Sequence, residues 1–206
     1  MKPLLIKQAI FMPLAAMLVP ILIAFFVPGY SSTSQHISDV ALLDGPIALI
    51  QRSAVIVAGA SILLFGAGLF RMDRRRMWFT SATAVLAGIG LASNGVWVEC
   101  SPMHGLYGLG GISMFILPAF FAAEIRQTEN NRPLTQASLL VSAVSMAYLW
   151  LMMSGFDPAA YRGLTQRLGT VVYFGWYSFA CYWLLYRGSM ASPTHTASAV
   201  TSASAT

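Results

Sequence analysis

Glu99 and His104 lie five positions apart in a short polar stretch between two long apolar stretches of the chain. A carboxylate and an imidazole can act together in general acid–base catalysis, and either can form hydrogen bonds with a bound ligand. Ionisable groups at the edge of the hydrocarbon region of a membrane are costly to keep there. We therefore treat this polar stretch as a candidate functional site.

A second group of such residues, His36, Ser38 and Asp39, lies in residues 29–46, the longest connection in the interior of the chain. This first loop contains no lysine or arginine. Its eighteen residues can extend over ~60 Å, far more than the distance between neighbouring helices. The first loop is therefore long enough to fold back over the ends of the helices.

We expect His36 and His104 to lie near each other beneath the first loop, where they would line a cavity. Ile37 and Val40, the apolar residues of the same segment, are expected to face down onto the helices. The alternative is a structural cap, in which these polar side chains only tie the ends of the helices together.

The composition indicates an integral membrane protein, because 57% of the 206 residues are hydrophobic and only 9% are charged. The net charge of +5 comes from basic residues in short connections, so it does not indicate a nucleic-acid partner. Two histidines and two carboxylates could hold zinc, but no pair has the spacing that places two ligands on one helix face. We therefore assign no metal and no cofactor.

Six apolar stretches are long enough to cross a ~30 Å hydrocarbon core as helices. They are residues 8–27, 52–70, 77–98, 106–123, 134–153 and 168–186. The sequence thus predicts an all-α bundle of six transmembrane helices in residues 1–187. Residues 188–206 are rich in Ser, Thr and Ala, and we expect them to form a disordered cytoplasmic tail.

The distribution of basic residues predicts the orientation of this bundle. In a six-span arrangement, nine basic residues share one side of the membrane and three share the other. The nine are Lys2, Lys7, Arg71, Arg74, Arg75, Arg76, Arg126, Arg132 and Arg187, and the three are Arg52, Arg162 and Arg167. Both termini are therefore expected in the cytoplasm, and loops 1, 3 and 5 on the outer face.

Arg162 and Arg167 precede the last apolar stretch, on the side with few basic residues. Their guanidinium groups could reach lipid headgroups, or each could pair with a carboxylate. Because an unpaired charge at the membrane edge is costly, we expect at least one ion pair between hairpins, with Asp39 to Arg167 as the first choice.

Aromatic residues are frequent in the apolar stretches. We expect most of them, including Trp78, Trp150, Tyr173 and Trp176, to face lipid or to lie at its interface with water.

Three short motifs carry a resemblance to a known family. They are His36 followed by Ile37-Ser38-Asp39, Pro102 followed by His104-Gly105, and Gly163-Leu164-Thr165-Gln166-Arg167 before the last apolar stretch. With these motifs the chain, apart from its tail, resembles bacterial multi-pass membrane proteins catalogued as domain of unknown function 998. It resembles more distantly the Frag1/DRAM/Sfk1 group of eukaryotic membrane proteins, some of which act in remodelling lipid anchors. The resemblance implies six helices in the bacterial cytoplasmic (inner) membrane and brings no established activity.

Two classes of function fit these residues. In the first, the outer-face site binds a membrane lipid or another amphiphile, with its anionic head against Arg162 and Arg167 and with hydrogen bonds from His36, Ser38 and His104. In the second, a membrane-embedded enzyme modifies a lipid or isoprenoid-like substrate. His104 would then be the general acid or base, oriented by Asp39 or Glu99. A transporter is a weaker third interpretation, because no span is expected to contain a buried ionisable residue and no inverted repeat is evident.

Overall fold

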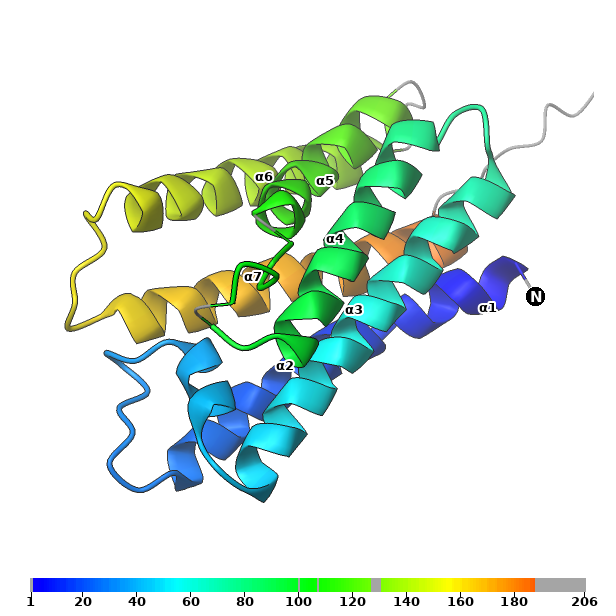
Figure 1. Cartoon of the computed structure of the whole chain (residues 1–206). Helices are drawn as coiled ribbons and strands as arrows, with labels where there is room; N and C mark the ends of the chain where they lie inside the picture. Colours follow the sequence, from blue (N-terminus) through cyan, green and yellow to red (C-terminus); the bar gives the residue numbers. More distant parts are fainter. Residues whose placement is uncertain (1, 100, 107, 127–130, 188–206) are drawn as a thin grey trace, which may run out of the picture.

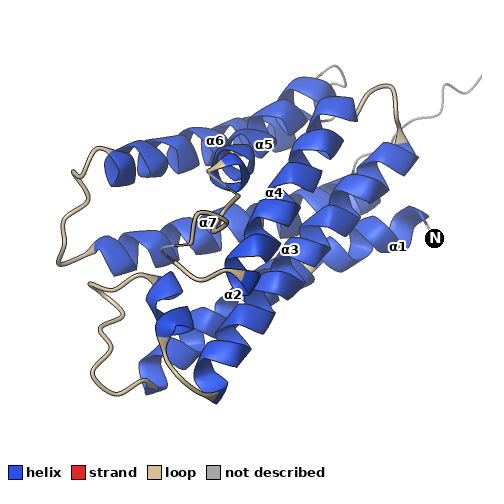
Figure 2. Ribbon diagram, in the orientation of Figure 1, coloured by secondary structure: helices blue, strands red, loops and turns tan. Residues whose placement is uncertain are grey.

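The computed structural model describes residues 2–99, 101–106, 108–126 and 131–187, and in these ranges all regular structure is helical (Figures 1 and 2). The α-helices are α1 (Lys2–Lys7), α2 (Met12–Ile23), α3 (Pro46–Met72), α4 (Trp78–Val96), α5 (Leu109–Ile125), α6 (Arg132–Met153) and α7 (Arg162–Tyr182). Short 3-10 turns η1 (Gln8–Ile10), η2 (Ala24–Phe26) and η3 (Ile37–Leu42) lie in the first quarter, and the π-helix η5 (Trp183–Arg187) extends α7. The tail expected at 188–206 lies outside the described residues.

Five helical segments are long and apolar enough to cross a membrane. They are Leu4–Phe26, Pro46–Met72, Trp78–Val96, Arg132–Met153 and Arg162–Arg187. The remaining long helix, α5, is apolar but has only 17 residues, or about 26 Å of rise. The all-helical membrane class is confirmed, whereas length and composition support five of the six expected spans.

The first of these segments is not one regular helix. The 3-10 turn η1 separates α1 from α2, and Pro13 follows as the second residue of α2. Proline has no backbone N–H, and its ring would clash with the carbonyl of residue Ala9 if an α-helix continued through it. The interruption therefore follows from the position of Pro13.

Glycines bring α3, α4 and α5 into close contact. A Cβ atom on Gly59 of α3 would lie 2.6 Å from the carbonyl oxygen of Gly88 of α4. A Cβ atom on Gly90 of α4 would overlap the Cα atom of Gly110 of α5. Small residues at such positions allow helix backbones to approach directly. The three helices therefore form the tightly packed side of the bundle.

A cluster of aromatic rings fills the centre of the molecule. Tyr177 of α7 packs edge-on against Phe65 of α3, and Trp176 does the same against Phe121 of α5, both with ring centroids 5.3 Å apart. Trp176 and Tyr173 are buried, so the expectation that they face lipid was wrong. Edge-to-face partners inside the bundle stabilise these rings there. Trp78 and Trp150 are exposed, as expected.

Two helices begin earlier than the hydropathy pattern predicted, because arginine was taken as the end of a span. α3 begins at Pro46 and contains Arg52, whose Nε and Nη2 groups donate to the carbonyl oxygens of Gly95 and Val96 at the end of α4, at 2.9 and 2.8 Å. α7 begins at Arg162 rather than after Arg167. In both cases the guanidinium group bonds to backbone carbonyls at the end of the bundle and can therefore lie within a helix.

Of the five long segments, α6 is the least covered by the rest of the molecule. It packs on α5 and α7 and exposes a row of large side chains on its other faces. In Figure 1, α5 and α6 lie together along one side of the bundle, and α7 lies between them and the segment that contains α2. The first loop, in blue, lies near the start of α7.

Candidate functional site: a cavity beneath the first loop

A cavity of about 640 Å³ lies inside the bundle, with walls from α2, η3 and all of the helices from α3 to α7. Most of its wall is apolar. The polar side chains that line it are Ser38, Gln51, Asn94, His104, Ser145, Tyr148, Gln166 and Thr170. This volume is in the range of cavities that bind small molecules.

The polar side chains gather at one end of the cavity. Gln51 lies in the second turn of α3, Asn94 in the last turn of α4, and Gln166 in the second turn of α7. These positions share one end of the bundle, because α3 and α4 are antiparallel and the first loop bonds to the start of α7. One or two turns deeper the wall is mostly apolar and includes Leu91 and Phe174. The cavity is therefore polar next to the first loop and apolar in its interior.

Two amide groups in this wall have an oxygen atom without a partner in the described part of the chain. Gln51 is only 3% exposed, and its Oε1 atom accepts no hydrogen bond from the described residues; the same is true of the buried Oδ1 atom of Asn94. An unsatisfied buried polar group costs about 1–3 kcal/mol. A molecule in the cavity that offers hydrogen bonds at this end would remove that cost.

His104 lies in a turn formed by residues 101–106, before α5 begins at Leu109. Its Nδ1 atom is 2.8 Å from the carbonyl oxygen of Trp97. A carbonyl oxygen can only accept, so Nδ1 carries the proton, and in the neutral ring Nε2 is an acceptor. His104 therefore has a fixed ring orientation and one nitrogen free to meet a ligand.

Arg167 holds the first loop and does not form the expected ion pair with Asp39. The guanidinium group is buried, and Nη1 donates to the carbonyl oxygens of Gln35 and Gly163 at 3.0 and 2.8 Å. The carboxylate of Asp39 instead accepts the backbone N–H of His36 at 2.9 Å. The prediction was wrong because the path of the loop brings its carbonyl groups to Arg167, while Asp39 closes a local turn.

Tyr30 completes this junction between the first loop and α7. Its hydroxyl accepts a hydrogen bond from Nη2 of Arg167 at 2.8 Å and donates to the carbonyl oxygen of His36 at 2.6 Å. Burial raises the pKa of Tyr30 above its ordinary value of 10, and the adjacent Arg167 opposes this shift. The phenol therefore keeps its proton at neutral pH and stays a donor.

Further contacts join the same two segments. Nε of Arg162 donates to the carbonyl oxygen of Ser34 at 2.8 Å, and the side-chain oxygen of Gln166 accepts the backbone N–H of Ile37 at 2.6 Å. Ile37 and Val40 are buried beneath the loop, which confirms the expected direction of these side chains. The first two turns of α7 thus fix the loop over the cavity.

The structure divides the candidate residues into three groups. His104 and Ser38 line the cavity. His36, Asp39, Arg162 and Arg167 make the hydrogen bonds that shape and hold the first loop. Glu99 is exposed and is not among the residues that line the cavity. Of the two histidines expected to line it together, only His104 does, because His36 precedes η3 and the residues of η3 face inward.

Sequence reasoning missed Gln51 and Gln166 as cavity residues. Gln51 was assigned to a connection because the second span was expected to begin at Arg52. The pair Gly45-Pro46 was the available signal, since proline is favoured in the first turn of a helix, and a start there places Gln51 inside α3. Gln166 belongs to the motif Gly163-Leu164-Thr165-Gln166-Arg167, but its neighbour Arg167 was expected to bind the ligand.

The long apolar helices and the mostly apolar internal cavity define a multi-pass membrane protein. A family model described as a protein of unknown function (DUF998) matches residues 10–183, and the chain belongs to this family. No curated protein and no solved structure matches the chain. The more distant resemblance to the Frag1/DRAM/Sfk1 group stays a prediction.

Proposed function

We propose that this protein binds an amphiphilic small molecule or membrane lipid in the cavity beneath the first loop. The apolar part of the ligand would lie against the interior wall, and its polar group would meet Gln51, Asn94 and His104. The observation that carries this proposal is a pair of buried amide oxygens that have no hydrogen-bond partner among the described residues, at one end of a mostly apolar cavity.

The distribution of charge favours a neutral polar group on the ligand. Among the described residues that line the cavity, His104 is the only one whose side chain can carry a charge near neutral pH. Arg162 and Arg167, which we first expected to bind an anionic head, donate to the first loop instead. Hydroxyl, amide or ester groups match the amides and the imidazole better than a phosphate does.

The ligand has a direct path from the membrane. Ile112 of α5, Met153 of α6 and Val172 of α7 line the cavity and are 53%, 76% and 42% exposed, respectively. The cavity therefore reaches the surface between helices that face lipid. A membrane amphiphile can enter there without crossing water.

We further propose the arrangement of this site in the bacterial cytoplasmic membrane. α5 serves as a sixth span, because a mostly apolar helix of 17 residues matches a slightly thinned bilayer. The excess of basic residues on one side then supports cytoplasmic termini and an outer location for the first loop and the polar end of the cavity.

An enzyme that uses His104 has less support than a binding protein. A general base normally needs a group that orients it, and here the backbone carbonyl of Trp97 takes that position. Asp39 closes the turn at His36, and Glu99 is exposed. Neither carboxylate is among the residues that line the cavity.

The test of binding uses two glycines that differ only in their location. Gly111 lines the cavity, and a Cβ atom there would have no neighbour within 4 Å, so the side chain of Gly111→Leu should occupy part of the cavity. Gly175 of α7 also has open space and is not in the cavity wall, which makes Gly175→Leu the matched control. Leucine favours a helix more than glycine does, so both variants should fold.

Native mass spectrometry of the full chain in mild detergent would measure the mass and occupancy of any co-purified ligand. We expect wild type and Gly175→Leu to carry the same ligand, and Gly111→Leu to lose at least about tenfold in affinity for it. Equal occupancy in all three proteins, or no ligand in wild type after reconstitution with total membrane lipid, would remove the proposal.

A further inference from the structure

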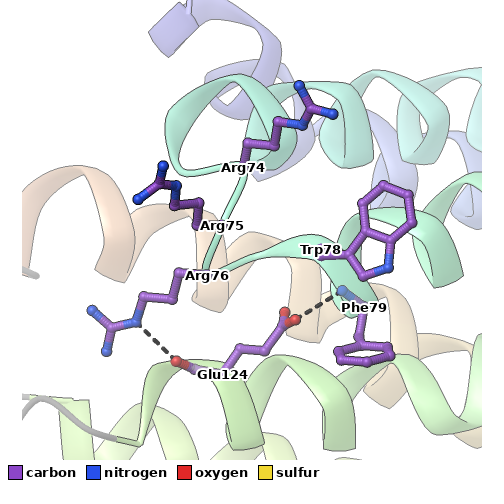
Figure 3. A pocket seen from close by; sticks show the side chains of 6 residues that line it. All are labelled: Arg74, Arg75, Arg76, Trp78, Phe79 and Glu124. Atoms are coloured by element: carbon purple, nitrogen blue, oxygen red, sulfur yellow. Dashed lines mark hydrogen bonds between the residues drawn. The ribbon is translucent and has the colours of Figure 1, made fainter.

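A second hollow, of about 690 Å³, lies at the turn between α3 and α4, at the end of these helices away from the first loop. Its walls are Arg74, Arg75, Arg76, Trp78, Phe79 and Glu124 (Figure 3). In Figure 3, the side chains of Arg75 and Arg76 extend to one side of the hollow, and Trp78 and Phe79 lie on the other. It shares no residue with the cavity described above.

Among the described residues of this wall, the only carboxylate is that of Glu124, and it is already bonded within the protein. Oε1 of Glu124 accepts the backbone N–H of Phe79 at 2.8 Å, and Oε2 accepts the backbone N–H and the hydroxyl of Thr80. Glu124 of α5 therefore caps the N-terminus of α4, where the helix dipole also favours a negative charge. Both carboxylate oxygens are therefore bonded at the N-terminus of α4.

The arginines give the hollow an excess of positive charge. Nε of Arg76 donates to the backbone carbonyl of Glu124 at 2.9 Å, which fixes its side chain at the edge of the hollow. The guanidinium carbon of Arg74 lies 5.3 Å from the ring centroid of Phe70, and Arg75 is exposed. Asp73, the nearest acidic residue in sequence, accepts the backbone N–H of Arg76. The hollow therefore suits an anion.

Exposed aromatic rings next to these charges indicate an anion that carries an apolar part. Trp78 is 51% exposed and Phe79 is 61% exposed, although both adjoin the arginines. Phe79 continues toward Phe120 of α5, with ring centroids 6.0 Å apart. Aromatic residues beside arginine at the ends of spans are typical of the interface between headgroups and acyl chains. A small soluble anion has no apolar part that could pack against these exposed rings.

We propose that this hollow binds the headgroup of an anionic phospholipid, with its phosphate against Arg74 and Arg75. One acyl chain would follow Phe79 and Phe120 along the outside of α4 and α5. This site is separate from the cavity beneath the first loop and does not depend on what that cavity binds.

The experiment compares lipid retention by the full chain in a neutral detergent. Native mass spectrometry would follow titration with phosphatidylglycerol or phosphatidylcholine for wild type, Arg74→Gln/Arg75→Gln and Arg71→Gln. Arg71 is the matched control, because it is exposed in the last turn of α3, just before this turn, but does not line the hollow. We expect wild type and Arg71→Gln to prefer phosphatidylglycerol, and the double variant to lose at least about fivefold in affinity for it.

Three outcomes would overturn the proposal. They are equal binding of both lipids by wild type, an equal loss in Arg71→Gln and in the double variant, and full competition by soluble glycerol phosphate. The last would show that the hollow recognises a free anion without an acyl chain. Phe79→Ala tests the contribution of the apolar surface. It leaves every arginine in place and should also weaken phosphatidylglycerol binding.

Discussion

Gln51 and Asn94 occupy positions where an apolar side chain would cost less in the empty protein, since their buried amide oxygens have no hydrogen-bond partner among the residues that the structure describes. By contrast, the amide of Gln8 donates to the backbone carbonyl oxygens of Leu5 and Ser61 at 2.9 and 3.0 Å and also bonds to the Ser61 hydroxyl. Gln8 and Gln51 therefore differ in whether the protein supplies their hydrogen-bond partners. One is satisfied by the protein, and the other is left for a ligand.

This difference predicts opposite effects of the same substitution. Gln51→Leu should raise the stability of the ligand-free protein by about 1 kcal/mol, because it removes an unsatisfied polar group, and should lower ligand occupancy. Gln8→Leu should lower stability by a similar amount or more and leave occupancy unchanged. Thermal unfolding in detergent measures the first quantity, and native mass spectrometry measures the second. A loss of stability in Gln51→Leu would show that its amide has a structural role.

Glu124 supports a further prediction about single residues, because its carboxylate caps α4 from a neighbouring helix. Glu124→Ala removes the cap and should destabilise the protein by about 1–2 kcal/mol. Glu124→Gln keeps one acceptor and should cost less. Thermal unfolding of both variants in the same detergent checks the order. Equal stability of wild type and Glu124→Ala would mean that water replaces the cap at no cost.

At the scale of elements, the positions of the helices could be predicted from hydropathy, but two of their starts could not. Charged residues were taken to end the spans, whereas Arg52 and Arg167 lie inside α3 and α7 and bond to backbone carbonyls. The predicted ion pair between Asp39 and Arg167 was wrong for a related reason. Which acceptor reaches a guanidinium group depends on the path of the loop, and no local sequence pattern contains that path.

The junction between the first loop and α7 predicts unequal roles for its two arginines. Arg167→Met leaves buried carbonyl groups of the loop and Tyr30 without a donor, and should cost about 2–4 kcal/mol. Arg162→Met removes one exposed hydrogen bond and should cost less than about 1 kcal/mol. Limited proteolysis of the first loop should accelerate in Arg167→Met and stay near wild type in Arg162→Met. Equal rates in the two variants would contradict this assignment.

At the scale of the whole molecule, composition alone predicted a membrane-embedded helical bundle, because no soluble core needs so much apolar surface. The cavity could not be predicted in this way. Its walls come from α2, η3 and the helices α3 to α7, so its existence depends on how these helices rotate and pack. His104 was identified from its residue type, whereas its neighbours in the wall, Gln51 and Gln166, required the fold.

The topology of the molecule can be tested by cysteine labelling from one side of the membrane. In a background with Cys100→Ser and Cys181→Ala, a cysteine at Ser34 in the first loop should react with an impermeant maleimide added outside intact cells. A cysteine at Arg75 should react only after permeabilisation, since the turn between α3 and α4 is expected in the cytoplasm. Reaction of both cysteines from outside would rule out the proposed orientation.

The backbone contact between Gly90 and Gly110 leaves no room for a side chain of any size between α4 and α5. Evolution can therefore hardly alter the wall of the cavity on that side, since one added methyl group would push the helices apart. α6, which packs mainly on α5 and α7 and is the least covered of the long segments, can accept larger or smaller residues without such a penalty. Relatives that have diverged to hold ligands of another size are thus expected to differ first in residues 132–153, on a scaffold that stays the same.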